Sequence, residues 1–212
     1  DGDAVFRDTF YGLYALVENA NGGFLTRWYE DPSGSLFEQW DVDYYDGYVP
    51  CPNLYGSDGC FELEEGKDDR SNIQGLADAM ELSGQARYDE AAEHINWEAF
   101  INYWAVGSLV GQYDAYPYSS PGDDCHIYDD PTTGNLWYIP HGMDEAFYSP
   151  SHDFRSTNGV LSAACKAVPE CAEALTERNW EVYDIAEEWG WLEYHDQVQA
   201  QIEDHVLEDT NK

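Results

Sequence analysis

The chain has 212 residues, enough for one domain with a sizeable core or for two small lobes. It carries 43 acidic against 9 basic residues, a net charge of −34, and such a surface repels nucleic acids and anionic membranes. Aromatic residues make up 16% of the chain, which excludes the low hydrophobicity of a disordered protein. No stretch of eighteen apolar residues occurs, so we expect no membrane insertion. Because of the negative charge, we also expect no nucleic-acid partner. The acidity itself fits high salt, cation binding or a location outside the cell.

The five cysteines give information on the compartment. Cys51 and Cys60 bracket one loop-like segment, and Cys165 and Cys171 bracket another. Short-range pairs of this kind predict local disulfides and an oxidising, extracellular compartment. The alternative is free thiols in a cytosolic protein. Cys125 is left over, either buried or paired with something upstream.

The first part of the chain has the features of strands and turns. Alternation of apolar and polar residues predicts two strands within residues 4–18, and turn residues separate the later candidates. The segment from Phe24 to Tyr29 fits either a short helix or an extended segment. Further strands are predicted at residues 35–40 and 61–64, on either side of an acidic, aromatic loop at 41–59.

The second part of the chain is predicted to be mostly helical. Ser71 or Asn72 is expected to cap a helix that runs to about Leu82 and is ended by Gly84. Asn96 is expected to cap a central amphipathic helix. Other helices are predicted at residues 88–94, 160–167, 170–178, 180–188 and 191–208. Strands followed by helices indicate an α+β protein, with a β-rich portion at 1–70 and a helical portion at 71–212.

The stretch from residue 96 to residue 147 is the strongest candidate for chemistry. Its helix ends at Asp114, Asp124 lies in the loop that follows, and Asp144 comes after a hairpin that turns at residues 132–135. Acids at the ends of adjoining elements can converge on one divalent cation or on one hydroxyl nucleophile. Carboxylate oxygens are the ligands that Mg²⁺ prefers, together with the phosphates of a nucleotide.

Other residues are weaker candidates. His126 and His141 lie in or next to the hairpin, and with Asp144 they are a conceivable metal trio. Glu18 ends an apolar strand, where it either pairs with a lysine near a phosphate or faces solvent. No P-loop, nucleophile elbow or dinucleotide-binding glycine motif is present in the sequence.

In several ordered segments the chain resembles the CotH kinase family, the spore-coat-protein-H-like proteins. Each segment is a weak signal alone, but their order along the chain is fairly specific. The resemblance covers roughly residues 11–147. The matching segments are 11–18, 24–25, 96–104, 111–114, 126–134 and 139–144.

The resemblance implies one domain over residues 1–212 with an atypical protein-kinase-like fold, which has a small antiparallel β N-terminal lobe and a larger helical C-terminal lobe. Part of the N-terminal lobe is then expected upstream of residue 1. The implied function is a secreted or surface phosphotransferase that uses ATP and Mg²⁺ to modify Ser or Thr of a protein substrate.

The resemblance also implies roles for individual residues. Asp114 matches the catalytic acid that orients the substrate hydroxyl. Asp144 matches the Mg²⁺-binding acid, and Asp124 is the nearest substitute for a second metal ligand. Trp137 or Tyr138 could stack on adenine, and Glu18 is a further candidate in the cofactor site.

Two departures from the family pattern keep other functions open. His141-Gly142 stands where the family has Trp-Asp, and Asp124 stands near the place of an Asn. The alternative is a catalytically inactive, kinase-like structural, coat or adhesion protein with a surface or coat-protein partner. A third possibility, compatible with both, is that the acids bind Ca²⁺ and order the loops at 41–59 and 114–126.

Overall fold

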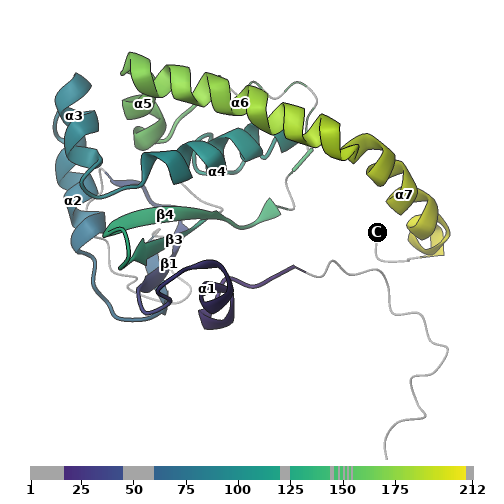
Figure 1. Ribbon diagram of the computed structural model, residues 1–212, viewed down its shortest axis with the longest axis horizontal. Coiled ribbons are helices and arrows are strands. Elements are labelled where there is room, and N and C mark those ends of the chain that lie inside the picture. The colour runs from purple at the N-terminus through teal and green to yellow at the C-terminus, as the bar shows by residue number, and fades with distance from the viewer. Residues whose placement is uncertain are drawn as a thin grey trace, which may run out of the picture. The chain divides into compact units, whose positions relative to one another are not determined.

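The computed structural model describes residues 17–44, 60–119, 125–143, 146–147, 149, 151, 153 and 155–208. The chain divides into two compact units, one made of residues 1–18 and 184–212 and the other of residues 19–183. The second unit contains the sheet and most of the helices (Figure 1). The strands predicted within residues 4–18 and most of the loop at 41–59 lie outside the described residues.

Four antiparallel strands form a sheet in the order β2-β1-β3-β4. The predicted strands at 35–40 and 61–64 and the predicted hairpin are all confirmed. The sheet, however, is not confined to the N-terminal portion, because β3 of the later hairpin pairs directly with β1. The strands are β1 (Ser35–Trp40), β2 (Cys60–Glu65), β3 (Cys125–Asp130) and β4 (Asn135–Pro140).

The helices make the protein α+β, as predicted. Five of the described helices lie entirely within the unit of residues 19–183: α1 (Gly22–Trp28), α2 (Ser71–Met80), α3 (Gly84–Ala91), α4 (Trp97–Val110) and α5 (Val160–Lys166). The other two are α6 (Pro169–Trp189) and α7 (Trp191–Glu208). No described helix is long and apolar enough to cross a membrane.

Two features of the predicted helices were wrong. One continuous α6 replaces the two helices expected at 170–178 and 180–188, because no Gly or Pro interrupts the segment and Asn179 bonds back to the Leu175 carbonyl. Gly84 begins α3 rather than ending the helix before it.

The expected cap of α2 was also wrong. Arg70 occupies the cap position and its side chain makes no capping bond, while the Ser71 amide donates to Asp69 Oδ1 at 3.1 Å. The Asn72 side chain instead makes a tertiary connection, since its amide donates to Asp129 Oδ1 at 2.9 Å and to the Gly134 carbonyl at 3.0 Å. Asn72 therefore ties α2 to the β3–β4 hairpin.

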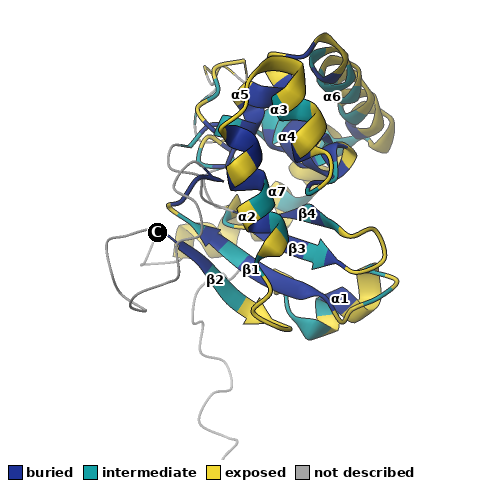
Figure 2. Cartoon of the chain, turned by 90° about the vertical axis from the view of Figure 1, so that its left-hand side faces the viewer, coloured by how far each residue is buried: buried dark blue, intermediate teal, exposed yellow. Residues whose placement is uncertain are grey.

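The main core lies between the helices and one face of the sheet. Figures 1 and 2 show α4 running along that face and α1 on the opposite side. Side chains of β1, β2, β3 and β4 that point toward α2, α4 and α5 are buried, and they form one apolar cluster with those helices. On the opposite face, which we call the outer face, a smaller cluster forms under α1 from Leu25, Leu36, Tyr128 and Ile139.

Helix α4 is positioned by both of its ends. Asn96 caps it as predicted, since its side-chain oxygen accepts from the Ala99 amide at 2.9 Å. Gly111 ends it in the left-handed conformation at φ 61°, which a glycine adopts without a steric penalty. Between these ends Phe100 and Trp104 are fully buried. The helix therefore places the segment that contains Asp114 at a fixed point beside the core.

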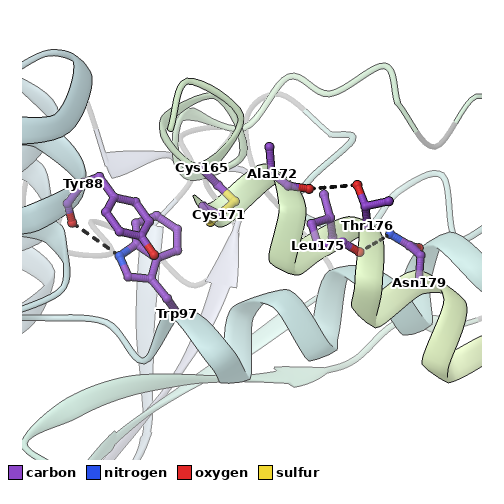
Figure 3. The surroundings of a disulfide bond; sticks show 8 residues. All are labelled: Tyr88, Trp97, Cys165, Cys171, Ala172, Leu175, Thr176 and Asn179. Atoms are coloured by element: carbon purple, nitrogen blue, oxygen red, sulfur yellow. Dashed lines mark hydrogen bonds between the residues drawn. A yellow bond between two sulfur atoms is a disulfide. The ribbon is translucent and has the colours of Figure 1, made fainter. Parts of the chain in front are cut away.

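The predicted disulfide between Cys165 and Cys171 is present and joins α5 to the first turn of α6 (Figure 3). Cys60 is also disulfide-bonded, and Cys51 lies outside the described residues. Cys125 is a buried thiol whose sulfur lies 3.4 Å from Gln39 Oε1.

Replacing both Cys165 and Cys171 by Ala is expected to lower the free energy of unfolding by about 2 kcal/mol, because the short closed loop no longer restricts the unfolded chain. Urea denaturation of the variant and of the wild type measures the difference. Reduction of the wild type by a thiol also breaks the Cys60 disulfide, so it should cause a loss at least as large. Equal stability in all three samples would contradict a stabilising role for this bond.

Candidate functional site

The segment after α4 and the segment after β4 are held side by side. The Gln112 side-chain amide donates to the Gly142 carbonyl at 2.6 Å, and the Phe147 amide donates to the Val110 carbonyl at 2.7 Å. Gln112 is fully buried. On the segment after β4, the bonded residues Gly142 and Phe147 lie before and after position 144 in the sequence. On the segment after α4, the bonded residue Gln112 precedes Asp114 by two positions. The structure thus brings together two of the three segments on which the predicted acids lie.

The predicted acids themselves are only partly described. Asp114 is half-buried in the turn that follows α4. Asp124 and Asp144 lie outside the described residues, so their ligand geometry stays a prediction. Asp124 directly precedes Cys125, the first residue of β3.

Phe147, at this junction, has an unusual backbone conformation. Its φ of 60° is in the left-handed region, which costs a bulky residue free energy and persists only where the surroundings impose it. Here the bond from its amide to Val110 is one such restraint. Strained residues of this kind concentrate at functional sites. No pattern in the sequence predicted this conformation.

The two residues predicted to stack on adenine lie on opposite faces of the sheet. Tyr138 is in the core, where its hydroxyl bonds to the Tyr44 hydroxyl at 2.9 Å and its ring contacts Phe100. Burial raises the pKa of the Tyr138 phenol well above its usual range. Trp137 is half-buried on the outer face, with its indole nitrogen bonded to Thr133 Oγ1 at 3.0 Å. Trp137 is therefore the better placed of the two.

Trp137 lines a pocket of about 500 Å³ between α1 and the β3–β4 hairpin. Its wall is largely aromatic, and Pro140, the last residue of β4, lies at one end. Since Gly142 follows two residues later, the pocket reaches the strand exit that leads to position 144. The other lining residues are Phe24, Trp28, Tyr29, Glu30, Asp130, Thr132, Thr133, Tyr138 and Ile139.

A second hollow, of about 900 Å³, lies between α4 and α6. Lys166 and Arg155 line it together with apolar side chains such as Trp180. None of the predicted site residues that the structure describes lines it. The pocket at Trp137 is thus the one that the predicted site and the structure share.

None of the described basic residues of the N-terminal part lines that pocket. Glu18 is exposed and belongs to the unit that contains residues 184–212. Arg70 has a structural role, because it donates to the Phe61 carbonyl at 2.6 Å, pairs with Asp68 and lies over the Phe37 ring. Arg27 and Lys67 are exposed.

The weaker candidates His126 and His141 do come together. Their ring centroids are 4.5 Å apart and the ring planes are perpendicular. Burial, and then the proximity of His141, lowers the pKa of His126 to about 4, so its ring is neutral at pH 7. A neutral imidazole is the form that binds metals.

Comparison with protein families decides the classification. A family model described as CotH kinase protein matches residues 4–205, which is nearly the whole chain. The chain belongs to the CotH family. A search of curated proteins found no match. Family membership confirms the resemblance predicted from the ordered segments, while the roles of the individual acids stay predictions.

Proposed function

We propose that this CotH-family protein is an ATP- and Mg²⁺-dependent phosphotransferase that modifies Ser or Thr of a protein substrate outside the cytoplasm. The observation that carries the proposal is the pair of hydrogen bonds between the exits of α4 and β4. Phosphoryl transfer requires mainly positioning and neutralisation of charge, and fixed adjoining segments provide the positioning.

The proposed roles follow from this junction. Asp114 would accept a hydrogen bond from the substrate hydroxyl and orient it toward the γ-phosphate. Asp144 and Asp124 would hold Mg²⁺, which would neutralise the phosphate charge when bound. The fit is chemical, because carboxylates are hard oxygen ligands and position 144 follows a strand exit that Gln112 fixes.

The aromatic pocket at Trp137 would hold the adenine. Trp137 forms one wall with its ring half-exposed, and the Tyr29 ring lies 6.0 Å from it in an edge-on arrangement. Stacking on a purine uses the free face of such a ring. The pocket volume is within the range of small-molecule sites.

The extracellular location is supported by the disulfide between Cys165 and Cys171. Disulfides persist in oxidising compartments and are rare in the cytosol. The strongly acidic surface also favours a basic protein substrate, since complementary charge accelerates encounter.

One observation favours the alternative of an inactive, kinase-like structural or coat protein. Arg70 is a half-buried cation that follows β2 in the sequence. Its guanidinium already bonds to the Phe61 carbonyl, pairs with Asp68 and lies over the Phe37 ring. Nucleotide phosphates would then depend on Mg²⁺ for most of their neutralisation. An inactive protein could still use the same fold as a surface or coat component.

A transfer assay separates the two functions. The protein is incubated with γ-labelled ATP and a library of basic peptides that contain Ser and Thr, with and without Mg²⁺. A phosphotransferase labels peptide hydroxyls or its own, and only when Mg²⁺ is present. Absence of label on every acceptor, in protein that nonetheless binds ATP and Mg²⁺, would overturn the enzyme and favour the inactive alternative.

A further inference from the structure

Five side chains of types that can bind metals lie near one another on the outer face of the sheet, and we call them the outer-face cluster: Glu38, Glu62, Glu64, His126 and His141. The strand register brings three of these together. Glu38 of β1 is the direct partner of Glu62 on β2 and of His126 on β3. Directly opposed residues in antiparallel strands share a face, so this row points away from the main core.

The three glutamates of the cluster are close enough to share one ion. One carboxylate oxygen from each of the three glutamates lies within 4.8 Å of the others. His141 Nε2 is 3.5 Å from Glu38 Oε1, and the His141 ring contacts the His126 ring edge-on. The three carboxylates therefore share one position, with the His141 imidazole next to Glu38 and the His126 ring next to His141.

The charge of the three glutamates is not balanced by the lysines and arginines that the structure describes. Within the part of the chain that the structure describes, no Lys or Arg forms an ion pair with Glu38, Glu62 or Glu64. Three adjacent carboxylates repel each other, and like charges on directly opposed strands are destabilising. A bound cation would remove this repulsion.

An independent feature of His126 points to a ligand. The residue is only 4% exposed, and its Nδ1 atom has no hydrogen-bond partner among the described residues. A buried polar nitrogen without a partner costs about 1–3 kcal/mol, so such atoms are rare unless a ligand satisfies them. His126 lies in the same cross-strand row as the glutamates, with its ring against the His141 ring.

We propose that the outer-face cluster binds one divalent first-row transition-metal ion, with Zn²⁺ as the reference ion. Mixed imidazole and carboxylate ligands suit such ions, whereas Mg²⁺ and Ca²⁺ are bound by oxygen alone. The site is separate from the acids of the proposed phosphotransfer site and does not depend on that function. Since His141 precedes position 144 by three residues, the metal would also fix the strand exit that leads there.

Metal binding is tested on the full chain after treatment with EDTA. Calorimetric titration with Zn²⁺ measures stoichiometry and affinity, and the visible spectrum of Co²⁺ reports imidazole and carboxylate coordination. Two site variants, His141→Ala and Glu62→Gln, remove ligands that are partly exposed, so the fold should persist, and circular dichroism checks it. Matched controls are His195→Ala and Glu90→Gln, which change an exposed histidine on α7 and an exposed acid on α3.

We expect one tight Zn²⁺ ion per chain, an affinity at least about tenfold lower in each site variant, and unchanged binding in both controls. A tenfold excess of Ca²⁺ or Mg²⁺ should not displace the ion. Zn²⁺ binding that is identical in the site variants and the controls would overturn the proposal. Displacement by Ca²⁺ would overturn it too, because it would indicate only general attraction of cations to an acidic surface.

Discussion

Replacing Asp114 by Asn is expected to lower the rate of phosphoryl transfer by about 10²–10⁴-fold, with ATP·Mg²⁺ affinity nearly unchanged. The amide cannot accept the proton of the substrate hydroxyl, and a positioned acid–base group contributes a factor of this size. The segment of Asp114 is fixed by its neighbours Gly111 and Gln112, so the substitution should not move it. Initial rates with labelled ATP measure the transfer, and calorimetry measures the affinity.

Two further variants make this result specific. Asp144→Asn should abolish ATP·Mg²⁺ binding itself, because the change removes a carboxylate from the metal. Asp89→Asn, an exposed acid on α3, removes the same charge elsewhere and should leave both transfer and binding unchanged. A phosphotransferase in which Asp114→Asn and Asp144→Asn both keep full activity would contradict the assigned roles.

Asp43 is the residue whose loss should most weaken the fold. It is completely buried in the segment after β1. Its Oδ1 atom accepts from the Tyr44 amide and from the Tyr116 hydroxyl, both at 2.8 Å, and its Oδ2 atom accepts from the Val160 amide at 3.1 Å. The Tyr116 hydroxyl in turn accepts from the Leu161 amide at 3.2 Å. One carboxylate thus joins the sheet, the turn after α4 and the start of α5.

Asp43→Ala is expected to lower the free energy of unfolding by about 3–5 kcal/mol, because it strands several buried donors at once. Tyr116→Phe removes one bond of the same network and should cost about 1–2 kcal/mol. Asp78→Ala, an exposed acid on α2, serves as the control and should change stability by less than about 0.5 kcal/mol. Urea denaturation of the three variants gives the comparison, and a loss below about 1 kcal/mol for Asp43→Ala would contradict the network.

Elements with a local chemical signal were predictable from the sequence. Asn96 could be recognised as a cap because it precedes an apolar-periodic segment, and the structure confirms its bond to Ala99. The β3–β4 turn was recognisable from its Gly and Asn residues, and Gly134 has a φ of 74° there. In both cases the signal and its structural effect lie within a few residues of each other.

Features that depend on distant pairing could not be predicted. Nothing in the sequence near Glu38 indicates that its partners are Glu62 and His126, because register follows from how the assembled sheet packs. For the same reason, the bond from Gln112 to Gly142 was missed, although it connects the two halves of the candidate site. The positions of the acids along the chain made them candidates, the family resemblance suggested their roles, and the structure supplied the contact between two of their segments.

The central claim is that the protein has a nucleotide site that requires Mg²⁺, and thermal melting tests it most directly. The melting temperature of the wild type is measured alone, with Mg²⁺, with ATP and with both, and the series is repeated with Asp144→Asn. A ligand at a hundredfold excess over its dissociation constant stabilises a protein by about 2.7 kcal/mol, which is readily measured. The account predicts a rise that needs both ligands and is lost in Asp144→Asn, whereas no rise with both ligands, or an equal rise in the variant, would contradict it.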